Sequence, residues 1–494
     1  MYTAIDSAII SGIKAQHIKV EVHTSRGLPG YCVVGMIDTA IRESKERIRS
    51  ALSSSKIKWP ESRITVNLAP ANIRKSGTGC ELAILVGLLC SSKQIPHHTF
   101  NNSAVLGELG LDGTIRAISG IMPRVIELRK LGIKHFYIPS KNAHEARLIN
   151  DIEVYPLENI NQMLNCLSNV SSWPQIENPK IVDSSMQDFG DFKDVKGLPL
   201  GCEAMEIMAA GNHHTLLMGS PGIGKTLLAE KVQGIMPKLN YNESSELTAI
   251  VSAIEGSVTN LITNRPFRNP HHSSTVASII GGGSQKVSPG EATRAHHGIL
   301  FLDELAEFSS SVIDSLREPL ETGKIQISRS SFKLTLPANF VLLACSNPCP
   351  CAKSRDECIC TEANRQRYLR RLSGPLLDRF DIRLEIFKSN LNSSTHNSSD
   401  MRERIKIARS LQENRFKETS ISSNSKMRSE MLGLYAPLDD LCAKLLKEKS
   451  EIRKLSMRGT CAIWRLSRTI ADLDNCQQIK DFHLEKAFEL REDL

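Results

Sequence analysis

Three short apolar runs in the middle of the chain are each followed by small or polar residues. The runs span residues 216–218, 298–302 and 339–345. Continuous apolar runs of this length are typical of parallel strands buried on both faces. The polar residues after each run would then lie at the carboxyl edge of a sheet, where α/β proteins bind their ligands. The pattern predicts an α/β domain with its site at that edge.

The first run leads into a loop that fits the phosphate-binding pattern G-x-x-x-x-G-K-[ST] at every fixed position. Its glycines let consecutive N–H groups turn inward around phosphates at the start of a helix. Lys225 is expected to reach the β- and γ-phosphates of ATP, and Thr226 to ligate magnesium. A Gly-rich turn without a ligand is the alternative. The expected nucleotide-binding residues are Gly219, Ser220, Pro221, Gly222, Ile223, Gly224, Lys225, Thr226 and Asp303.

The second and third runs end in residues suited to hydrolysis. Asp303 is expected beside the magnesium ion, and Glu304 where it can polarise the attacking water. Both acids could instead cap a helix that begins near Leu305, but the phosphate loop upstream favours the catalytic interpretation. Asn347, after the third run, is placed to sense the γ-phosphate or to position water.

Length and composition indicate a globular protein of several domains. The chain has 494 residues, enough for two or three separate cores. No apolar run approaches the ~20 residues that span a bilayer, and the N-terminus lacks a basic region and a cleavage site, which predicts a cytoplasmic protein without membrane contact. Thirteen cysteines then indicate reduced thiols and a candidate metal site rather than disulfides. A net charge of +8 permits nucleic-acid binding without demonstrating it.

Changes in composition predict five segments. Residues 1–165 mix strand-like and helix-like runs, and residues 166–190 read as a linker. Residues 191–388 carry the phosphate loop. Residues 389–427 are crowded with Ser and Asn, and are expected to be a mobile, low-complexity insertion. Residues 428–494 show helical spacing, typical of a small helical lid.

Several long strings give the chain a family resemblance. They are RPFRNPHH, IIGGGS, PGEATRAHHGILFLDEL, ISRS, SNPCPC and LSGPLLDRFDI within residues 188–385, and GLPGYCVVG and RITVNLAPANIRKSG nearer the N-terminus. Through them the chain resembles the magnesium-chelatase-like AAA+ ATPases, and within these the YifB/ComM group of competence-associated branch-migration ATPases. The resemblance implies an AAA+ P-loop domain of α/β class with a parallel sheet and a helical lid.

The first 165 residues resemble the C-terminal domain of Lon protease, an α+β fold like ribosomal protein S5 domain 2. In the favoured register the nucleophilic Ser falls at Gly79 and the Lys base at Met122. Neither residue can attack a peptide or accept a proton, so covalent proteolysis is not expected. A shift of register would bring in Ser76 or Ser119. The domain is expected to serve subunit contacts or substrate engagement.

The resemblance also assigns roles to two arginines. Arg379 matches the arginine finger that reaches a neighbouring subunit's nucleotide, and Arg458 matches the sensor-2 position on the lid. Each could instead form an ordinary surface salt bridge. A finger supplied by another subunit implies a ring, most often a hexamer in this family.

Four cysteines lie close together in the sequence as two C-x-C pairs: Cys349, Cys351, Cys358 and Cys360. Four thiolates can surround one zinc ion tetrahedrally, and a short polar loop would gain order from the metal. Free reduced thiols are the alternative. Cys345 is excluded because it belongs to the third apolar run.

Residues 323–336 alternate apolar and polar positions on both sides of a short turn, which predicts a β-hairpin. In related ring ATPases such a hairpin points into the central channel. Lys324, Arg329 and Lys333 would give it positive charge for contacts with a DNA backbone. An edge hairpin protected by lysines is the alternative. A second pore candidate is the loop at residues 281–286.

Together these features predict a ring-forming ATPase that moves along single-stranded or branched DNA, by helicase action or branch migration, in recombination of incoming DNA. ATP and magnesium are its expected cofactors, with zinc at the cysteines. A metal-chelatase motor subunit and a protein-remodelling chaperone are the alternatives.

Overall fold

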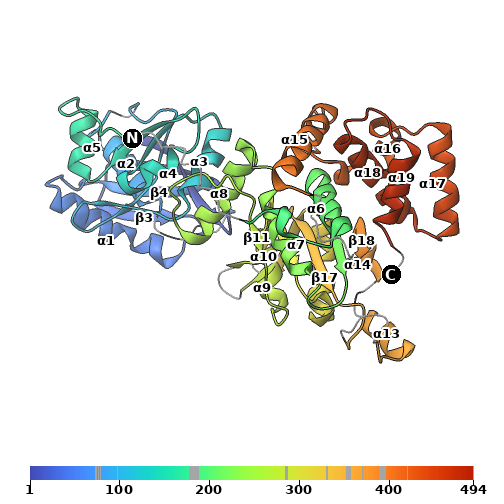
Figure 1. Ribbon diagram of the computed structural model, residues 1–494. Helices are drawn as coiled ribbons and strands as arrows, with labels where there is room; N and C mark the ends of the chain where they lie inside the picture. Colours follow the sequence, from blue (N-terminus) through green and yellow to red (C-terminus); the bar gives the residue numbers. More distant parts are fainter. Residues whose placement is uncertain are drawn as a thin grey trace. The chain divides into compact units, whose positions relative to one another are not determined.

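The computed structural model describes residues 1–72, 75, 77, 79–96, 98–176, 189–283, 288–329, 332–351, 358–369, 372, 374–388, 396–419 and 421–492. The chain forms two compact units (Figure 1). Unit 1 consists of Met1–Asp183 and Asn240–Thr263, and unit 2 of Ser184–Leu239 and Asn264–Leu494. Residues 177–188 of the expected linker lie outside the described residues.

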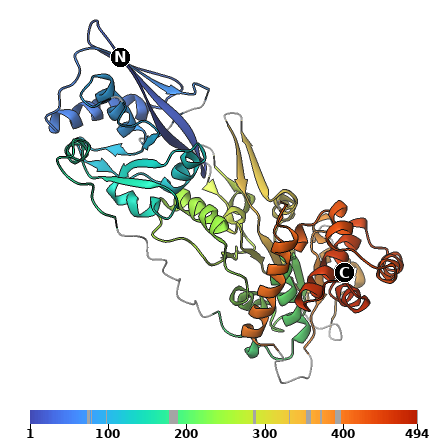
Figure 2. The same cartoon turned by 90° about the horizontal axis from the view of Figure 1, so that it is seen from above.

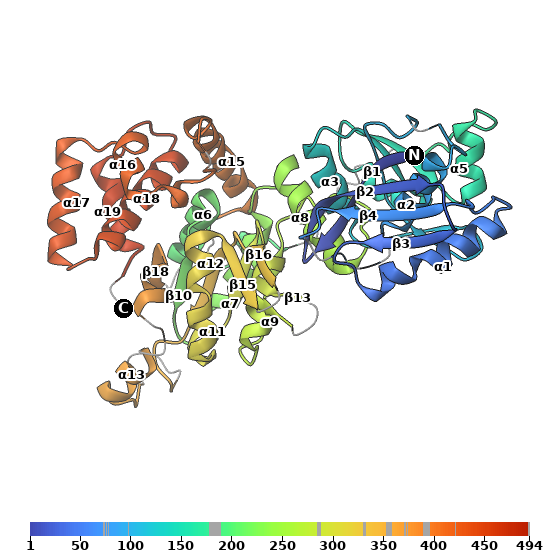
Figure 3. The same ribbon diagram turned by 180° about the vertical axis from the view of Figure 1, so that it is seen from behind.

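Unit 1 is built on a seven-stranded mixed sheet in the order β3-β4-β2-β1-β5-β8-β9, labelled in part in Figure 3. In β4, the residues Ile64, Val66 and Leu68 are buried and alternate with more exposed positions, as period-2 patterning requires. The strands are β1 (Tyr2–Ser11), β2 (Lys14–Ser25), β3 (Gly30–Val34), β4 (Arg63–Ala69), β5 (Ser103–Val105), β8 (His135–Pro139) and β9 (Glu153–Leu157). The helices include α1 (Thr39–Ser54), the wholly buried α2 (Glu81–Ser91), α3 (Ile121–Lys130), α4 (Ser140–Ala146) and α5 (Ile160–Leu167).

The resemblance to Lon assigns its catalytic pair to Gly79 and Met122, and both positions are closely packed. A Cβ at Gly79 would lie 2.7 Å from Nη1 of Arg124. Arg124 is itself buried and donates a hydrogen bond to the carbonyl of Ala8. Met122 is fully buried in the core. In the favoured register these two positions thus carry no side chain that could attack a peptide or accept a proton.

Helix α8 (Tyr241–Glu255) belongs to unit 1, whereas the sequence predicts one continuous domain over residues 191–388. It begins with a capping box between Asn240 and Glu243, and it packs on α3. Ser252 donates a 2.5 Å hydrogen bond to the buried carboxylate of Glu145. The membership of α8 in unit 1 could not be predicted from the sequence, because the apolar face of a helix does not specify the core against which it packs.

The core of unit 2 is a five-stranded parallel sheet in the order β11-β14-β17-β10-β18. Its strands are β10 (Thr215–Met218), β11 (Phe267–Arg268), β14 (Ile299–Leu302), β17 (Val341–Ser346) and β18 (Ile382–Glu385). Every residue of β10, β14, β17 and β18 is buried. Burial on both faces explains the apolar runs of β10, β14 and β17. The three strands predicted from apolar runs are confirmed, as is the α/β fold class.

The predicted hairpin is also present, as β15 (Lys324–Arg329) paired antiparallel with β16 (Phe332–Pro337). Ile325, Ile327 and Leu336 are buried, while Lys324 is exposed. Figure 2 shows the hairpin as a narrow gold ribbon that stands out from the body of unit 2.

Residues 398–415 form an 18-residue helix, α15 (Ser398–Arg415), so the expected mobile insertion at 389–427 is wrong for this segment. Met401, Ile405 and Ala408 are buried at helical spacing, and Gln412 donates to the carbonyl of Ala210 in α6 (Pro199–Gly211). The helical pattern is weak in the sequence because the segment has few apolar residues among many charged ones. The rest of the helical subdomain comprises α16 (Ser429–Tyr435), α17 (Asp440–Ile452), α18 (Met457–Leu473) and α19 (Asp481–Glu489).

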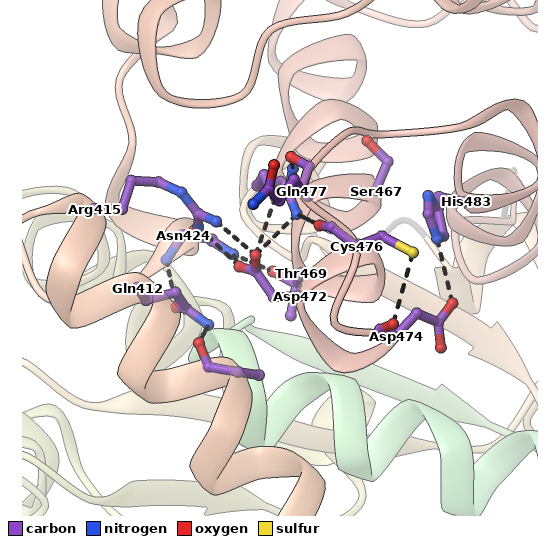
Figure 4. Close-up of polar contacts among 12 residues, drawn as sticks. Gln412, Arg415, Asn424, Ser467, Thr469, Asp472, Asp474, Cys476, Gln477 and His483 are labelled. Carbon is purple, nitrogen blue, oxygen red and sulfur yellow. Dashed lines mark hydrogen bonds and ion pairs between the residues drawn. The ribbon is translucent and has the colours of Figure 1, made fainter.

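A buried polar network around Asp472 joins α15 to α18 (Figure 4). Asp472 is fully buried, and its carboxylate accepts from Arg415 at 2.5 and 2.8 Å, from Asn424 at 2.8 Å and from Arg468 at 3.1 Å. A buried carboxylate is stable only when its lone pairs are satisfied in this way. The network therefore ties α18 to the end of α15.

A second buried carboxylate joins these helices to the sheet. Asp381, just before β18, accepts from His213 Nδ1 at 2.9 Å and from Arg465 of α18 at 2.9 Å. Burial alone would raise the pKa of Asp381, but Arg465 and His213 outweigh it and hold that pKa far below its usual range. Arg491 donates to the carbonyls of Phe380 and Asp381.

The neighbouring His214 gives this junction a pH dependence. Its Nδ1 accepts a 3.0 Å hydrogen bond from the N–H of Leu342, which requires a neutral ring. Desolvation by burial lowers the pKa of His214 to about 3. The unfolded chain, with an ordinary His pKa of ~6.5, takes up the proton first as pH falls.

We therefore expect unit 2 to lose about 1.4 kcal/mol of unfolding free energy from His214 alone between pH 7.5 and 5.5. The contribution is fully present above pH ~6.5 and is lost toward pH ~3. The variant H214N keeps an acceptor for Leu342 but does not titrate, so its stability should fall less. Urea unfolding of both proteins at the two pH values checks this. Equal losses would contradict the assignment.

Candidate functional site

The phosphate loop connects β10 to α7 (Lys225–Lys231) at the carboxyl edge of the sheet. Gly222 and Gly224 have φ values of +74° and +111°, which favour glycine. A cavity of about 450 Å³ opens beside the loop. Its walls are Pro221, Gly222, Gly224, Lys225, Thr226, Leu227, Asp303, Glu304, Cys345, Ser346 and Asn347. The structure thus brings the predicted residues of all three strand ends together.

Lys225 is held by its own loop. Its Nζ donates to the carbonyls of Gly219 at 2.6 Å and Ser220 at 3.1 Å, and to Oδ1 of Asn347 at 3.1 Å. Burial lowers the pKa of Lys225, and the nearby anionic groups oppose that shift. The ammonium group is therefore placed at the cavity wall, on partners that an anionic ligand can replace.

The paired acids after β14 have different surroundings. Asp303 accepts from Thr226 Oγ1 at 3.0 Å and from the N–H of Glu304 at 3.0 Å. Magnesium takes oxygen ligands, and the Thr226 hydroxyl and Asp303 carboxylate are hard oxygen donors on one wall of the cavity. These two residues fit the ion. The side chain of Glu304, in contrast to its N–H, has its contact with His272.

Glu304 has φ +51° and ψ +49°, a left-handed conformation that costs a non-glycine residue about 1–3 kcal/mol. Such strain persists where surrounding structure imposes it, and it marks functional positions. The acids do not act as helix caps through their side chains: the short helix that follows, Leu305–Glu307, has no side-chain cap bond.

Sequence reasoning missed His272 as a neighbour of Glu304. Its Nδ1 lies 3.5 Å from Oε2 of Glu304, and its ring packs at a tilt against the ring of His271. The signal was present as the string NPHH shortly after β11 (Phe267–Arg268), but only the pairing of β11 with β14 brings it to the acids. A histidine there can orient the carboxylate.

Arg379 and Arg458 do not line this cavity. They lie together elsewhere in unit 2, where both donate to the same oxygen, Oε1 of Glu321, at 2.6 and 2.7 Å. Arg379 also donates to the carbonyl of Pro375 at 2.5 Å. Both arginines therefore form salt bridges within the subunit, and together with Glu321 they make one cluster.

The four cysteines converge. Sγ of Cys349 lies 3.2 Å from that of Cys351 and 3.5 Å from that of Cys358, and the last two are 3.6 Å apart. All four sulfurs, including that of Cys360, lie within 4.8 Å of one another. Zn–S bonds of about 2.3 Å in a tetrahedron place sulfurs ~3.8 Å apart, so this donor set fits a zinc ion. Residues 352–357 lie outside the described residues.

Of the three expected DNA contacts, Lys324 is exposed at the start of β15. Arg329 and Lys333 lie at the distal end of the hairpin, where Lys333 pairs with Ser328 and Arg329 with Phe332 in the backbone ladder. Their side chains lie outside the described parts of the structure. Within those described parts, no helix has the length and apolarity needed to cross a bilayer.

The parallel sheet, the phosphate loop after β10, the acids after β14 and the Asn after β17 define a P-loop domain of the AAA+ class. Comparisons with known proteins agree. Family models match three regions: "Magnesium chelatase, subunit ChlI" at residues 191–394, "Subunit ChlI of Mg-chelatase" at 20–142, and "Magnesium chelatase, subunit ChlI C-terminal" at 395–491.

Three relatives extend over nearly the whole chain. YifB of Escherichia coli is 37% identical over 97% of this chain and 95% of its own length. The competence protein ComM of Haemophilus influenzae is 35% identical over the same shares. An uncharacterized protein of Mycobacterium tuberculosis is 35% identical over 94% of both chains. The chain belongs to the ChlI-like AAA+ family, in the group of YifB and ComM.

Proposed function

We propose that this protein is an ATP-driven ring motor that acts on DNA, by helicase action or branch migration during recombination of incoming DNA. The observation that carries the proposal is the cavity where the phosphate loop, Asp303, Glu304 and Asn347 meet. Membership of the family supports ATP hydrolysis. Similarity to a protein named for competence supports a role with incoming DNA.

The residues of the cavity divide the work of hydrolysis. The loop N–H groups and Lys225 bind the phosphates, and Lys225 exchanges its loop carbonyls for phosphate oxygens. Thr226 and Asp303 hold magnesium, which when bound neutralises charge on the phosphates. Glu304 orients and polarises the water, while Asn347 contacts the γ-phosphate.

The remaining positive charge comes from a second subunit. Because Arg379 lies away from its own cavity, it can serve as a finger only for a neighbour's nucleotide. This arrangement requires a neighbouring subunit, which a ring supplies, and a hexamer accords with the resemblance. Arg458 joins Arg379 on the same face of the subunit.

The hairpin is the element proposed to track DNA. Its buried Ile325 and Ile327 anchor one face, which leaves Lys324 exposed, with Arg329 and Lys333 near the tip. Cations on a projecting ribbon suit the phosphate backbone and read no sequence. Insertion of a metal into a tetrapyrrole is the second candidate, because the family models carry the chelatase description.

The first test compares substrates. Forked DNA should raise the rate of ATP hydrolysis, whereas a porphyrin or an unfolded protein should not. E304Q should still bind ATP, because binding relies on the loop and Lys225, but its turnover should fall more than about a hundredfold, the usual scale of general-base effects. Phosphate release and nucleotide binding are measured side by side.

The matched control is E307Q, which makes the same charge change on an exposed residue outside the cavity wall. It should hydrolyse ATP at the wild-type rate. Stimulation by porphyrin instead of DNA would favour the chelatase alternative, and an active E304Q would remove Glu304 from the mechanism.

Mixing inactive subunits tests the shared site. R379A and K225A should each hydrolyse ATP poorly, yet their mixture should recover activity. In mixed rings an intact loop faces an intact arginine, which restores part of the ~10³-fold or larger effect of an arginine finger. Steady-state hydrolysis across mixing ratios is the measurement. If no ratio restores the rate, Arg379 does not act between subunits.

We also propose that Cys349, Cys351, Cys358 and Cys360 bind zinc. Elemental analysis of protein purified without chelators should find about one zinc per subunit. The double substitution C349S/C351S should lose the metal and local order only, because such sites chiefly organise their own loop. C32S, at an exposed cysteine outside the cluster, should keep the metal. Metal-free wild-type protein would refute the site.

A further inference from the structure

Glu321 lies where the sheet domain and the helical subdomain of unit 2 meet. It belongs to α12 (Arg317–Thr322), directly before the hairpin. Its Oε1 accepts from Arg379 Nη2 at 2.6 Å and from Arg458 Nη2 at 2.7 Å. Arg379 precedes β18, whereas Arg458 lies in the first turn of α18. One carboxylate thus joins two cations from separate parts of the unit.

The two guanidinium groups repel each other without an anion between them. Burial lowers the pKa of Arg379, Glu321 opposes this shift, and the positive charges of Arg458 and Arg317 add to it. Arg317 is itself paired with Asp314 at 2.6 Å. The hydrogen bond from Arg458 is the largest cause that lowers the pKa of Glu321. Glu321 is therefore the anion that keeps these cations together.

The charges of this cluster do not cancel. Two arginines and one glutamate leave one net positive charge, and Nε of Arg379 is buried without a hydrogen-bond partner among the described residues. Arg458 is about half exposed, with 47% of its side chain accessible. An anionic group that approaches this face would meet two oriented guanidinium forks, the geometry that suits phosphate oxygens.

We propose that Glu321 is a positioning residue that holds Arg379 and Arg458 as a pair, so that one subunit presents both to the nucleotide phosphates of its neighbour. The inference rests on the ring proposed above and adds a residue to the shared site. Without Glu321, repulsion moves Arg458 away with its exposed side chain, and the neighbour's nucleotide meets one cation in place of two.

The test is the variant E321Q, which keeps the size of the side chain and removes its charge. Hydrolysis should fall about tenfold, the scale expected when charge-assisted hydrogen bonds are lost. ATP binding and ring assembly should stay at wild-type levels. E318Q, an exposed position on the same helix, is the matched control and should be fully active.

Complementation separates positioning from a structural role. E321Q mixed with K225A should recover activity, because K225A subunits present intact arginines to intact loops of E321Q subunits. A mixture of E321Q with R379A should not recover ATP hydrolysis, because the arginine pair is impaired in both variants and neither can present an intact pair to a neighbour. The double variant E321Q/R379A should be no slower than R379A. Recovery with R379A, or a wild-type rate for E321Q alone, would overturn the proposal.

Two further results distinguish failure of the shared ring site from failure of the role proposed for Glu321. If R379A and K225A fail to complement each other, the shared ring site itself fails, whatever E321Q does. If E321Q does not assemble, E321D carries the test: it keeps the charge, so it should assemble, hydrolyse ATP at a rate between wild type and R379A, and complement K225A only. An E321D chain that complements R379A would refute the role of Glu321.

Discussion

The arrangement of unit 2 depends on the hydrogen bonds and ion pairs that the buried carboxylate of Asp381 makes. This carboxylate is buried between His213, two residues before the phosphate-loop strand β10, and Arg465 of the helical subdomain. Removing one partner of a buried ion pair leaves an uncompensated charge and costs about 3–5 kcal/mol. Arg379 lies two residues before Asp381 in the chain. The same bonds that attach the helices to the sheet therefore fix the segment that carries the candidate finger.

The nucleotide cavity combines a rigid sheet edge with polar side chains whose hydrogen bonds can be exchanged. The sheet edge is rigid because β10, β14 and β17 are buried along their whole length. The groups on it are held by exchangeable partners: Lys225 by loop carbonyls and Thr226 by Asp303. Glu304 alone is held in a costly left-handed conformation. Such an edge is preorganised to receive phosphates while its polar groups remain satisfied without them.

The division into units differs from the linear order of the sequence. The chain leaves unit 2 after residue 239 and returns at 264, having contributed α8 to unit 1. Because Ser252 bonds to Glu145 and Ala249 joins the core there, unit 1 is incomplete without this excursion. A cut made at the predicted linker would remove a helix that this core needs.

The sequence by itself determined the local chemistry: the phosphate loop, the acids after an apolar strand, the hairpin and the cysteine pairs. These signals are short and depend on residue type and spacing, which neighbours in the chain dictate. It misjudged residues 398–415, since Met401, Ile405 and Ala408 are too sparse to reveal a helix without α6 beside them.

Only the tertiary structure decided the rest. It brought His272 to Glu304, and it placed Arg379 and Arg458 on the single carboxylate of Glu321, although 137 residues separate Glu321 from Arg458. It also gave α8 to the other unit. Contacts of this kind follow from how packed elements cross, and no spacing along the chain encodes them.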